Sequence, residues 1–135
     1  PSFTFPGVAP EDLFDAVAER TVNAENAGFD FVTLMDHFYQ IRGVGEETEP
    51  MMESYATLSA LAMRTSKVKL LTLVTGVTYR NPAILAKIVT TLDVISKGRA
   101  MLGIGTAPAS SVAETLSVRR SMIEMVWSPL FGVIA

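Results

Sequence analysis

The stretch "KVKLLTLVTGVTYRNPAILAKIVTTLDVISKGRAMLGIG", residues 67–105, decides the fold of this chain. Its first ten residues, 67–76, are rich in aliphatic and β-branched side chains and predict a strand. Residues 81–96 predict a helix, because apolar side chains recur at helical spacing and Pro82 suits a first helical turn. Residues 99–105 predict a second buried strand. A strand, a helix and a strand joined by short turns indicate parallel strands with a right-handed crossover.

The flanking sequence continues the same alternation. Residues 10–27 predict a helix, and residues 29–35 predict a strand that is apolar at nearly every position, as a strand covered on both faces would be. A polar, glycine-containing loop at 41–49 precedes a predicted helix at 51–63. Beyond the second strand of the central stretch, residues 111–127 predict a last helix.

The predicted fold class is therefore α/β with parallel strands. The 135 residues are enough for one domain with a hydrophobic core. The pattern allows an open doubly wound sheet or part of a (β/α)8 barrel, and periodicity alone does not separate the two.

Composition argues against several classes of function. A net charge of −3 without a basic block argues against nucleic acid and anionic membrane surfaces as partners. The chain has no cysteine and one histidine, so a typical zinc site is not expected, and no metal is predicted. The absence of cysteine fits a reducing cytoplasm, and no apolar run approaches the length of a membrane span.

Polar residues gather where three predicted strands end. Asp36 and His37 end the first strand, residues 75–82 follow the next, and residues 103–108 follow the third. In parallel α/β folds this edge of the sheet is where ligands bind. The three clusters together therefore favour a binding pocket for a small molecule.

Each residue also has a purely structural interpretation. His37 alone could equally be a hydrogen-bonded loop histidine, and Thr75 and Thr78 could be ordinary strand and turn threonines. Gly103 and Gly105 could serve close packing inside the sheet. A binding protein for another small molecule lacks motif support, because there is neither a GxGxxG fingerprint nor a P-loop.

Two blocks carry a resemblance to a known family: "AENAGFDFVTLMDHFYQI" at 24–41 and "LVTGVTYRNPAILAKIVTTLDVISKGRAMLGIGTA" at 73–107. From Phe3 to about Ala107 the chain resembles the luciferase-like monooxygenases, most of all their branch of oxidoreductases that use the deazaflavin coenzyme F-420. The resemblance implies a TIM-type barrel with a cofactor, coenzyme F-420 or alternatively FMN, at its C-terminal mouth. It implies hydride transfer between that cofactor and a small organic substrate.

The resemblance also implies roles for single residues. His37 would orient the cofactor ring or handle a proton, which suits an imidazole because its ordinary pKa lies near neutrality. Asp36 is its candidate catalytic partner. The family's non-proline cis peptide would fall at Gly76–Val77. Arg80, like Leu85, Lys87 and Asp93, is interpreted as structural. The candidate cofactor-binding residues are Asp36, His37, Thr75, Gly76, Val77 and Thr106.

The resemblance covers only part of the family's barrel. Residues 1–107 correspond to its N-terminal part, about half a barrel, and residues 108–135 are expected to form a helical tail. The phosphate-binding loops of the family come from the other half, so we expect weak cofactor binding by these residues alone and self-association, most simply as a homodimer. The alternative function is a truncated, catalytically inactive α/β domain that self-associates.

Overall fold

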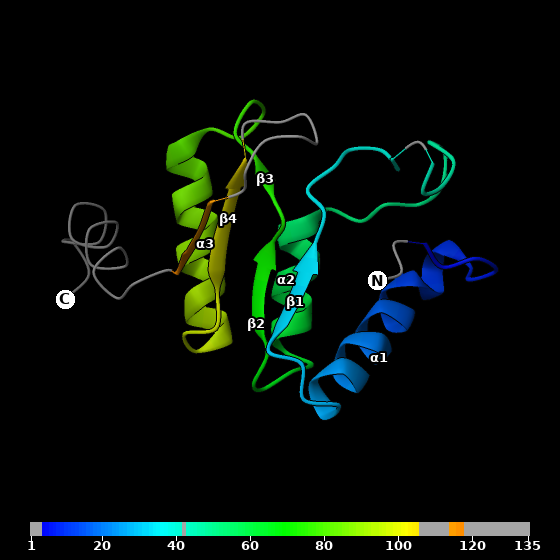
Figure 1. Cartoon of the computed structure of the whole chain (residues 1–135), viewed down its shortest axis with the longest axis horizontal. Coiled ribbons are helices and arrows are strands. Elements are labelled where there is room, and N and C mark those ends of the chain that lie inside the picture. The colour runs from blue at the N-terminus through cyan, green and yellow to red at the C-terminus, as the bar shows by residue number, and fades with distance from the viewer. Residues whose placement is uncertain (1–3, 42, 106–113, 118–135) are drawn as a thin grey trace.

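The computed structural model describes residues 4–41, 43–105 and 114–117. In chain order its elements are the 3-10 helix η1 (Pro10–Asp12), α1 (Leu13–Asn26), β1 (Phe31–Leu34), α2 (Ser54–Ala62), β2 (Lys69–Thr72), β3 (Thr75–Gly76), α3 (Pro82–Ser96), β4 (Met101–Gly105) and β5 (Glu114–Ser117). Between α1 and β4, helices alternate with strand segments, as the sequence predicts, and one of these segments is divided into two strands (Figure 1).

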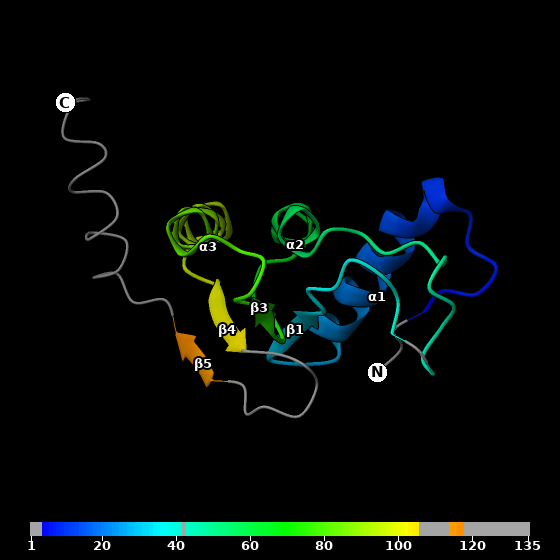
Figure 2. The same cartoon turned by 90° about the horizontal axis from the view of Figure 1, so that it is seen from above.

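The strands β1, β2, β3 and β4 run parallel. β1 pairs with β2 from Phe31–Lys69 to Leu34–Thr72, and β3 pairs with β4. A single parallel bridge between Leu70 and Ala100 links β2 to β4. Helices α2 and α3 lie side by side over one face of these strands, and α1 lies next to β1 at the edge of the sheet (Figure 2). One curved layer of parallel strands inside one layer of helices is the arrangement of part of a (β/α)8 barrel.

The hydrophobic core lies between the strands and the helices α2 and α3. Its fully buried side chains include Leu58 and Leu61 of α2, Leu70 of β2 and Leu92 of α3. Burial of such a side chain stabilises the fold by roughly 1.5–3 kcal/mol. The core therefore joins α2, β2 and α3 into one packed unit and fixes the direction in which their loops leave the sheet.

The prediction that β1 is covered on both faces is wrong. Val32 and Leu34 pack against the core, but Phe31 and Thr33 alternate with them and are exposed. Within the described part of the chain β1 pairs only with β2, and an apolar groove of about 530 Å³ lies between β1 and α1. The face of β1 turned away from the helices therefore has no covering layer among these residues.

The boundaries of α3 agree with the sequence prediction. The Asn81 side chain accepts hydrogen bonds from the N–H groups of Ala83 at 2.9 Å and Ile84 at 3.3 Å, and Pro82 occupies the first turn. At the other end, Lys97 and Gly98 both take positive φ angles, 59° and 86°. A left-handed pair of this kind ends a helix without leaving its last carbonyl groups unpaired.

Two other helices begin later than the sequence predicts. Residues Pro10–Asp12 form a 3-10 turn, and α1 begins only at Leu13. α2 begins at Ser54, because the Glu53 carboxylate accepts the N–H of Ala56 at 2.6 Å and caps the helix there. Glutamate is a less common cap than serine or aspartate, so the boundary has a weak local signal.

Two predictions in the second half of the chain need correction. The expected strand at 67–76 is interrupted between β2 and β3, and the non-proline cis peptide lies at Leu73–Val74, not at Gly76–Val77. The expected helix at 111–127 is wrong for residues 114–117, which form β5 antiparallel to β4. Backbone pairing along the edge of β4 prevails there over the weak helical periodicity; the rest of the expected helix lies outside the described residues.

Glu25 ties α1 to the loop before β2. Its carboxylate accepts the N–H groups of Ser66, Lys67 and Val68 at 2.6–3.0 Å. Burial raises the pKa of Glu25, but these hydrogen bonds outweigh it and lower the pKa to about 2.

No helix in the described ranges is both long and apolar enough to span a membrane.

Candidate functional site

The three predicted strand ends meet at one edge of the sheet. The Asp36 carboxylate, just after β1, accepts the N–H of Gly76 in β3 at 3.3 Å. The N–H of Val77, the next residue, donates to the carbonyl of Gly105 at the end of β4 at 3.3 Å. This is the carboxyl edge of the parallel strands, toward which the arrowheads in Figure 1 point. In such folds this edge carries the ligand site.

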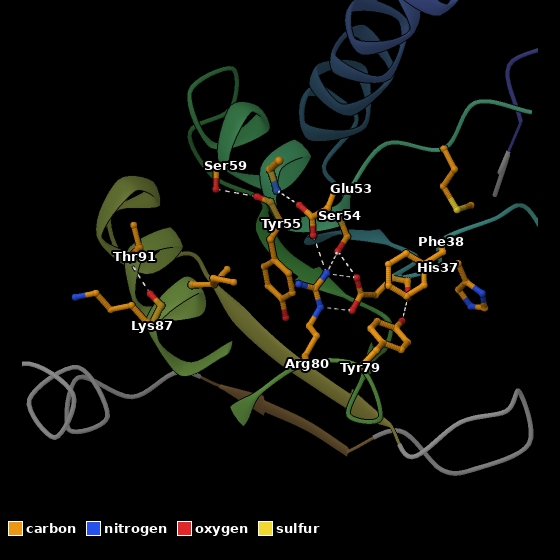
Figure 3. Close-up of a pocket in the computed structure, with 14 residues that line it drawn as sticks. His37, Phe38, Glu53, Ser54, Tyr55, Ser59, Tyr79, Arg80, Lys87 and Thr91 are labelled. Carbon is orange, nitrogen blue, oxygen red and sulfur yellow. Dashed lines mark hydrogen bonds and ion pairs between the residues drawn. The ribbon is translucent and has the colours of Figure 1, made fainter. Parts of the chain in front are cut away.

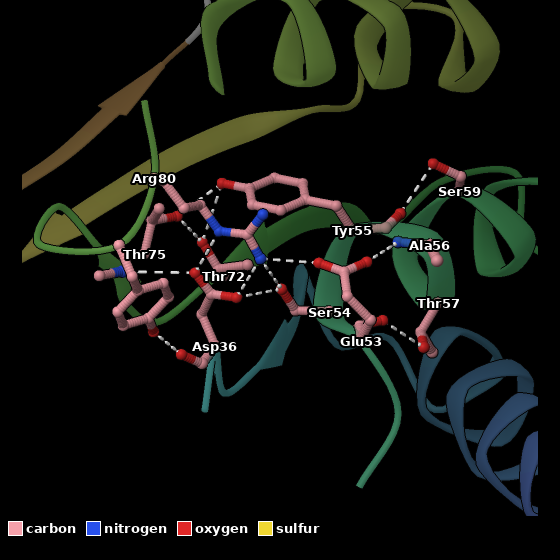
Figure 4. Close-up of polar contacts among 12 residues, drawn as sticks. Asp36, Glu53, Ser54, Tyr55, Ala56, Thr57, Ser59, Thr72, Thr75 and Arg80 are labelled. Carbon is pink, nitrogen blue, oxygen red and sulfur yellow. Dashed lines mark hydrogen bonds and ion pairs between the residues drawn. The ribbon is translucent and has the colours of Figure 1, made fainter. Parts of the chain in front are cut away.

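Asp36 lies in the middle of a hydrogen-bond network at this edge (Figure 4). One carboxylate oxygen, Oδ1, accepts from Ser54 Oγ at 2.7 Å and from Arg80 Nη2. The other, Oδ2, accepts from Arg80 Nε at 2.6 Å and from the Gly76 N–H. An ionised carboxylate offers about four acceptor positions, and here all four are used.

Arg80 connects Asp36 to the start of α2. Its Nη2 also donates to Glu53 Oε1 at 2.7 Å, and its guanidinium lies over the Tyr55 ring, 4.8 Å from the ring centroid. Glu53 caps α2, and Arg80 immediately precedes the Asn81 cap of α3. The loop after β1, the start of α2 and the start of α3 are thus joined through one guanidinium.

The charges of this network are mutually stabilised. Burial raises the pKa of the Asp36 carboxyl, but hydrogen bonds from Arg80 and Ser54 outweigh it and leave that pKa below its ordinary value. The Glu53 pKa is lowered in the same way against its own desolvation, by the Ala56 N–H and Arg80. The hydrogen bond to Asp36 raises the Arg80 pKa. Asp36 and Glu53 are therefore ionised at neutral pH and poorly suited to donate a proton.

Three buried hydroxyl groups form a further set of hydrogen bonds next to this charged network. The Tyr55 hydroxyl shares hydrogen bonds with Thr75 Oγ1 at 2.5 Å and Thr72 Oγ1 at 3.2 Å, and the two threonine hydroxyls also bond to each other. All three side chains are buried. Burial raises the pKa of Tyr55, so its phenol stays protonated. The Thr75 hydroxyl is thus already used inside the fold.

Gly76 leaves room for an aromatic side chain. A Cβ at this position would overlap the ring of Tyr79, whose hydroxyl donates to the backbone carbonyl of Asp36. The Tyr79 ring in turn lies 4.8 Å from the Phe38 ring, at 55° to it. Asp36 is therefore held by its backbone as well as by its carboxylate, and the loop after β1 follows a defined path.

His37 lies at the outer end of this arrangement. Its side chain is exposed and lies beyond Phe38, away from the Arg80 guanidinium (Figure 3). It borders a cavity of about 660 Å³ that runs from the loop after β1 between α2 and α3 and is also lined by Phe38, Tyr79, Arg80 and Lys87. An exposed imidazole on an anchored loop is free to act on a bound molecule.

The structure thus places five of the six candidate residues at one edge of the sheet. They differ in how far they are exposed to solvent. Asp36, Thr75 and Gly76 are buried, whereas His37 and Val77 are exposed. Thr106 lies outside the described residues. The cofactor contacts of all six stay predictions. The described residues contain no cluster of carboxylates and histidine suited to a metal ion.

The sequence interpretation missed the participation of Glu53, Ser54, Tyr79 and Arg80. Arg80, which the sequence interpretation takes as structural, does join the start of α3 to its neighbours, and it does so by bonding to a candidate site residue, Asp36. A signal existed for two of them, because Tyr79 and Arg80 belong to the polar cluster at 75–82. For Glu53 and Ser54 the signal was only that acidic and hydroxyl side chains precede an apolar helix.

The family assignment follows from comparison with known proteins. The family model described as luciferase-like monooxygenase matches residues 3–122, most of the chain. This chain belongs to the luciferase-like monooxygenase family. The network around Asp36 and Arg80 is therefore part of a luciferase-like barrel, and the sequence-based fold class, partial TIM-type barrel, is confirmed.

Relatives of this luciferase-like chain include redox enzymes with two kinds of cofactor in their names. It is 40% identical over 94 residues to an F-420-dependent glucose-6-phosphate dehydrogenase from Segniliparus rotundus, covering 69% of this chain and 27% of that protein. It also resembles the FMN-bound oxygenating constituent of 3,6-diketocamphane monooxygenase from Pseudomonas putida, with 27% identity and a TM-score of 0.65, covering 78% of this chain and 28% of that one.

A third relative is the coenzyme F-420-dependent tetrahydromethanopterin reductase from Methanopyrus kandleri, at 29% identity and a TM-score of 0.56, with 76% of this chain and 25% of that one covered. The luciferase-like chain therefore spans about a quarter of the length of these three proteins. Activity, substrate and assembly of the whole protein are accordingly matters for proposal.

Proposed function

We propose that the complete protein containing this chain is an oxidoreductase that exchanges a hydride between coenzyme F-420, or alternatively FMN, and a small organic substrate. The observation that carries this proposal is the placement of His37, an exposed imidazole at the carboxyl edge of the strands, on a loop anchored by Asp36. The names of the relatives from Segniliparus and Pseudomonas support the two cofactors.

The residues at this edge suit a flat, largely apolar ring. Phe38 and Tyr79 form an aromatic pair whose exposed parts lie next to His37, and Leu73 and Val77 add exposed aliphatic surface after β2 and β3. Aromatic and aliphatic walls with a few polar groups are typical of cofactor sites. The cofactor, when bound, supplies hydride chemistry that no amino-acid side chain provides.

One side chain would supply the remaining chemistry. His37 would give or take the proton that accompanies hydride transfer at the substrate oxygen, because the two ring nitrogens of an imidazole can donate and accept a proton. We expect coenzyme F-420 rather than FMN as the cofactor. The F-420-dependent relative from Segniliparus shares 40% identity with this chain, compared with 27% for the FMN-bound protein from Pseudomonas.

A titration of the complete protein with coenzyme F-420 and, separately, with FMN tests the proposed function. The expected result is saturable quenching of one cofactor's fluorescence, followed by reduction of that cofactor on addition of glucose-6-phosphate or a simple alcohol as trial substrate. Binding of neither cofactor would contradict the proposal. It would favour the alternative, a catalytically inactive α/β domain that self-associates.

We also propose that the protein is a homodimer in the cytoplasm. Exposed apolar side chains on the described surface, among them Phe29, Phe31 and Ile84, support association with a second copy. Sedimentation of the complete protein at several concentrations tests this, and a monomer at every concentration would contradict it.

A further inference from the structure

Asp36 and His37 are neighbours in sequence, but the structure gives them opposite surroundings. Asp36 is 5% exposed and bonded on both carboxylate oxygens, whereas His37 is exposed beyond Phe38. In Figure 4 the Asp36 side chain points toward Arg80 and Ser54, not toward open space. A residue whose acceptor positions are all filled inside the fold has little left to offer a cofactor.

We infer that Asp36 and Arg80 are positioning residues, which act on the reaction by fixing the direction of the His37 imidazole rather than by touching the cofactor or the substrate. This inference rests on the proposed function, in which His37 handles the proton. It assigns to Arg80 a role at the site, and it changes the role of Asp36 from a cofactor contact to an anchor.

Asp36 is held both by its side chain and by its backbone. Its carboxylate accepts hydrogen bonds from the Nε and Nη2 atoms of Arg80, in the forked arrangement that a guanidinium imposes. Its backbone carbonyl accepts the Tyr79 hydroxyl. The next peptide bond, which leads to His37, therefore leaves Asp36 in a set direction.

Arg80 is itself prevented from turning. Its Nη2 bonds to Glu53 Oε1 at 2.7 Å, and its guanidinium lies over the Tyr55 ring at 4.8 Å. These partners belong to the start of α2, which packs into the core through Leu58 and Leu61. The orientation of the His37 loop is thus transmitted from a rigid helix, and misplacement of a reacting group by about 1 Å can cost roughly 100-fold in rate.

A double-mutant cycle in the complete protein, loaded with the cofactor that it binds, tests this inference. The four proteins are wild type, Asp36→Asn, His37→Ala and the double variant, compared at saturating cofactor. We expect Asp36→Asn to lower kcat by roughly 10- to 100-fold while the cofactor dissociation constant changes by less than about threefold. The double variant should be no slower than His37→Ala, because a positioning residue has nothing to position once the imidazole is gone.

Two results would overturn the inference. In the first, the losses of the single variants multiply in the double variant, which would mean that Asp36 acts independently of His37. In the second, Asp36→Asn raises the cofactor dissociation constant about tenfold or more and leaves kcat unchanged, which would mean direct contact. If Asp36→Asn does not fold, Arg80→Lys replaces it in the cycle, since lysine keeps the charge but loses the fork.

A readout that does not depend on activity separates this inference from the proposed function. The imidazole NMR signals of His37 should shift in Arg80→Lys and stay unchanged in Arg64→Gln, which alters an exposed ion pair with Asp15. Unchanged His37 signals in Arg80→Lys would overturn the inference. Absence of turnover in the wild type, with the His37 signals shifted in Arg80→Lys, would contradict the proposed function alone.

Discussion

Arg80 holds the carboxylate of Asp36 with two nitrogen atoms, Nε at 2.6 Å from Oδ2 and Nη2 on Oδ1. The side chains are 16% and 4% exposed, so water and salt screen the pair only weakly. Residues that lie 44 positions apart in sequence are thereby joined at the carboxyl edge of the sheet. Removal of Arg80 would leave the Asp36 carboxylate buried without a counter-ion, whereas removal of Asp36 would leave Arg80 paired with Glu53 alone.

The first prediction concerns the stability of this pair. Asp36→Asn should lower the free energy of unfolding of the complete protein by about 3 kcal/mol, measured by chemical denaturation, because the guanidinium loses the carboxylate that binds two of its nitrogens and keeps only Glu53 as a counter-ion. The matched control is Arg64→Gln. Arg64 lies 3.6 Å from Asp15 and both side chains are exposed, so the change should be below about 1 kcal/mol. Equal losses in the two variants would contradict the account.

The second prediction is a pH dependence that originates at Glu25. Its folded pKa of about 2 lies below the ordinary value of 4.5. The carboxylate therefore contributes stability that is complete above pH 4.5 and is lost as the pH falls through about 2. Glu25→Gln should flatten the pH dependence of unfolding free energy within this window. If the unfolding free energy of the variant depends on pH as steeply as that of the wild type, other carboxylates cause the loss of stability at acidic pH.

The third prediction couples Gly76 to Tyr79. Gly76→Ala places a methyl group where the Tyr79 ring lies and should destabilise the protein by about 1–3 kcal/mol. In a Tyr79→Ala background, the same substitution should cost at least about 1 kcal/mol less, because the ring is absent. Thermal unfolding of the four proteins measures the coupling. A cost of Gly76→Ala that does not depend on residue 79 would refute the steric explanation.

The fourth prediction concerns the buried hydroxyls. Tyr55→Phe removes the hydrogen bonds to Thr72 and Thr75 and should cost about 1 kcal/mol of unfolding free energy. Tyr39→Phe is the control, because Tyr39 is 71% exposed and should change stability by less than about 0.5 kcal/mol. If both variants unfold alike, the Tyr55 hydroxyl contributes nothing measurable to stability.

Local signals in the sequence predicted much of the fold. The cap at Asn81, the proline at position 82 and the turn at Lys97–Gly98 set the ends of α3, and each acts on residues within one helical turn. Alternation of such segments led to a parallel α/β fold. The boundary at Glu53 was missed, because the cap depends on one carboxylate conformation rather than on a strong residue preference.

The parts that the sequence did not predict depend on distant partners. Phe31 is exposed because none of the described residues covers its face of β1. The strand β5 pairs antiparallel with β4 because the edge of β4 is open to another strand. The polar cluster at 75–82 indicated the position of the site. It could not show that Arg80 turns toward Asp36 while His37 turns outward, because no periodic pattern relates residues so far apart.

The most direct test of the central claim is turnover of the complete protein at saturating cofactor, as wild type and as His37→Ala. If His37 handles the proton of hydride transfer, the variant should be slower by roughly 100- to 10,000-fold. Its unfolding free energy should match that of the wild type, because the side chain is exposed. A His37→Ala protein that turns over at the wild-type rate would contradict the claim.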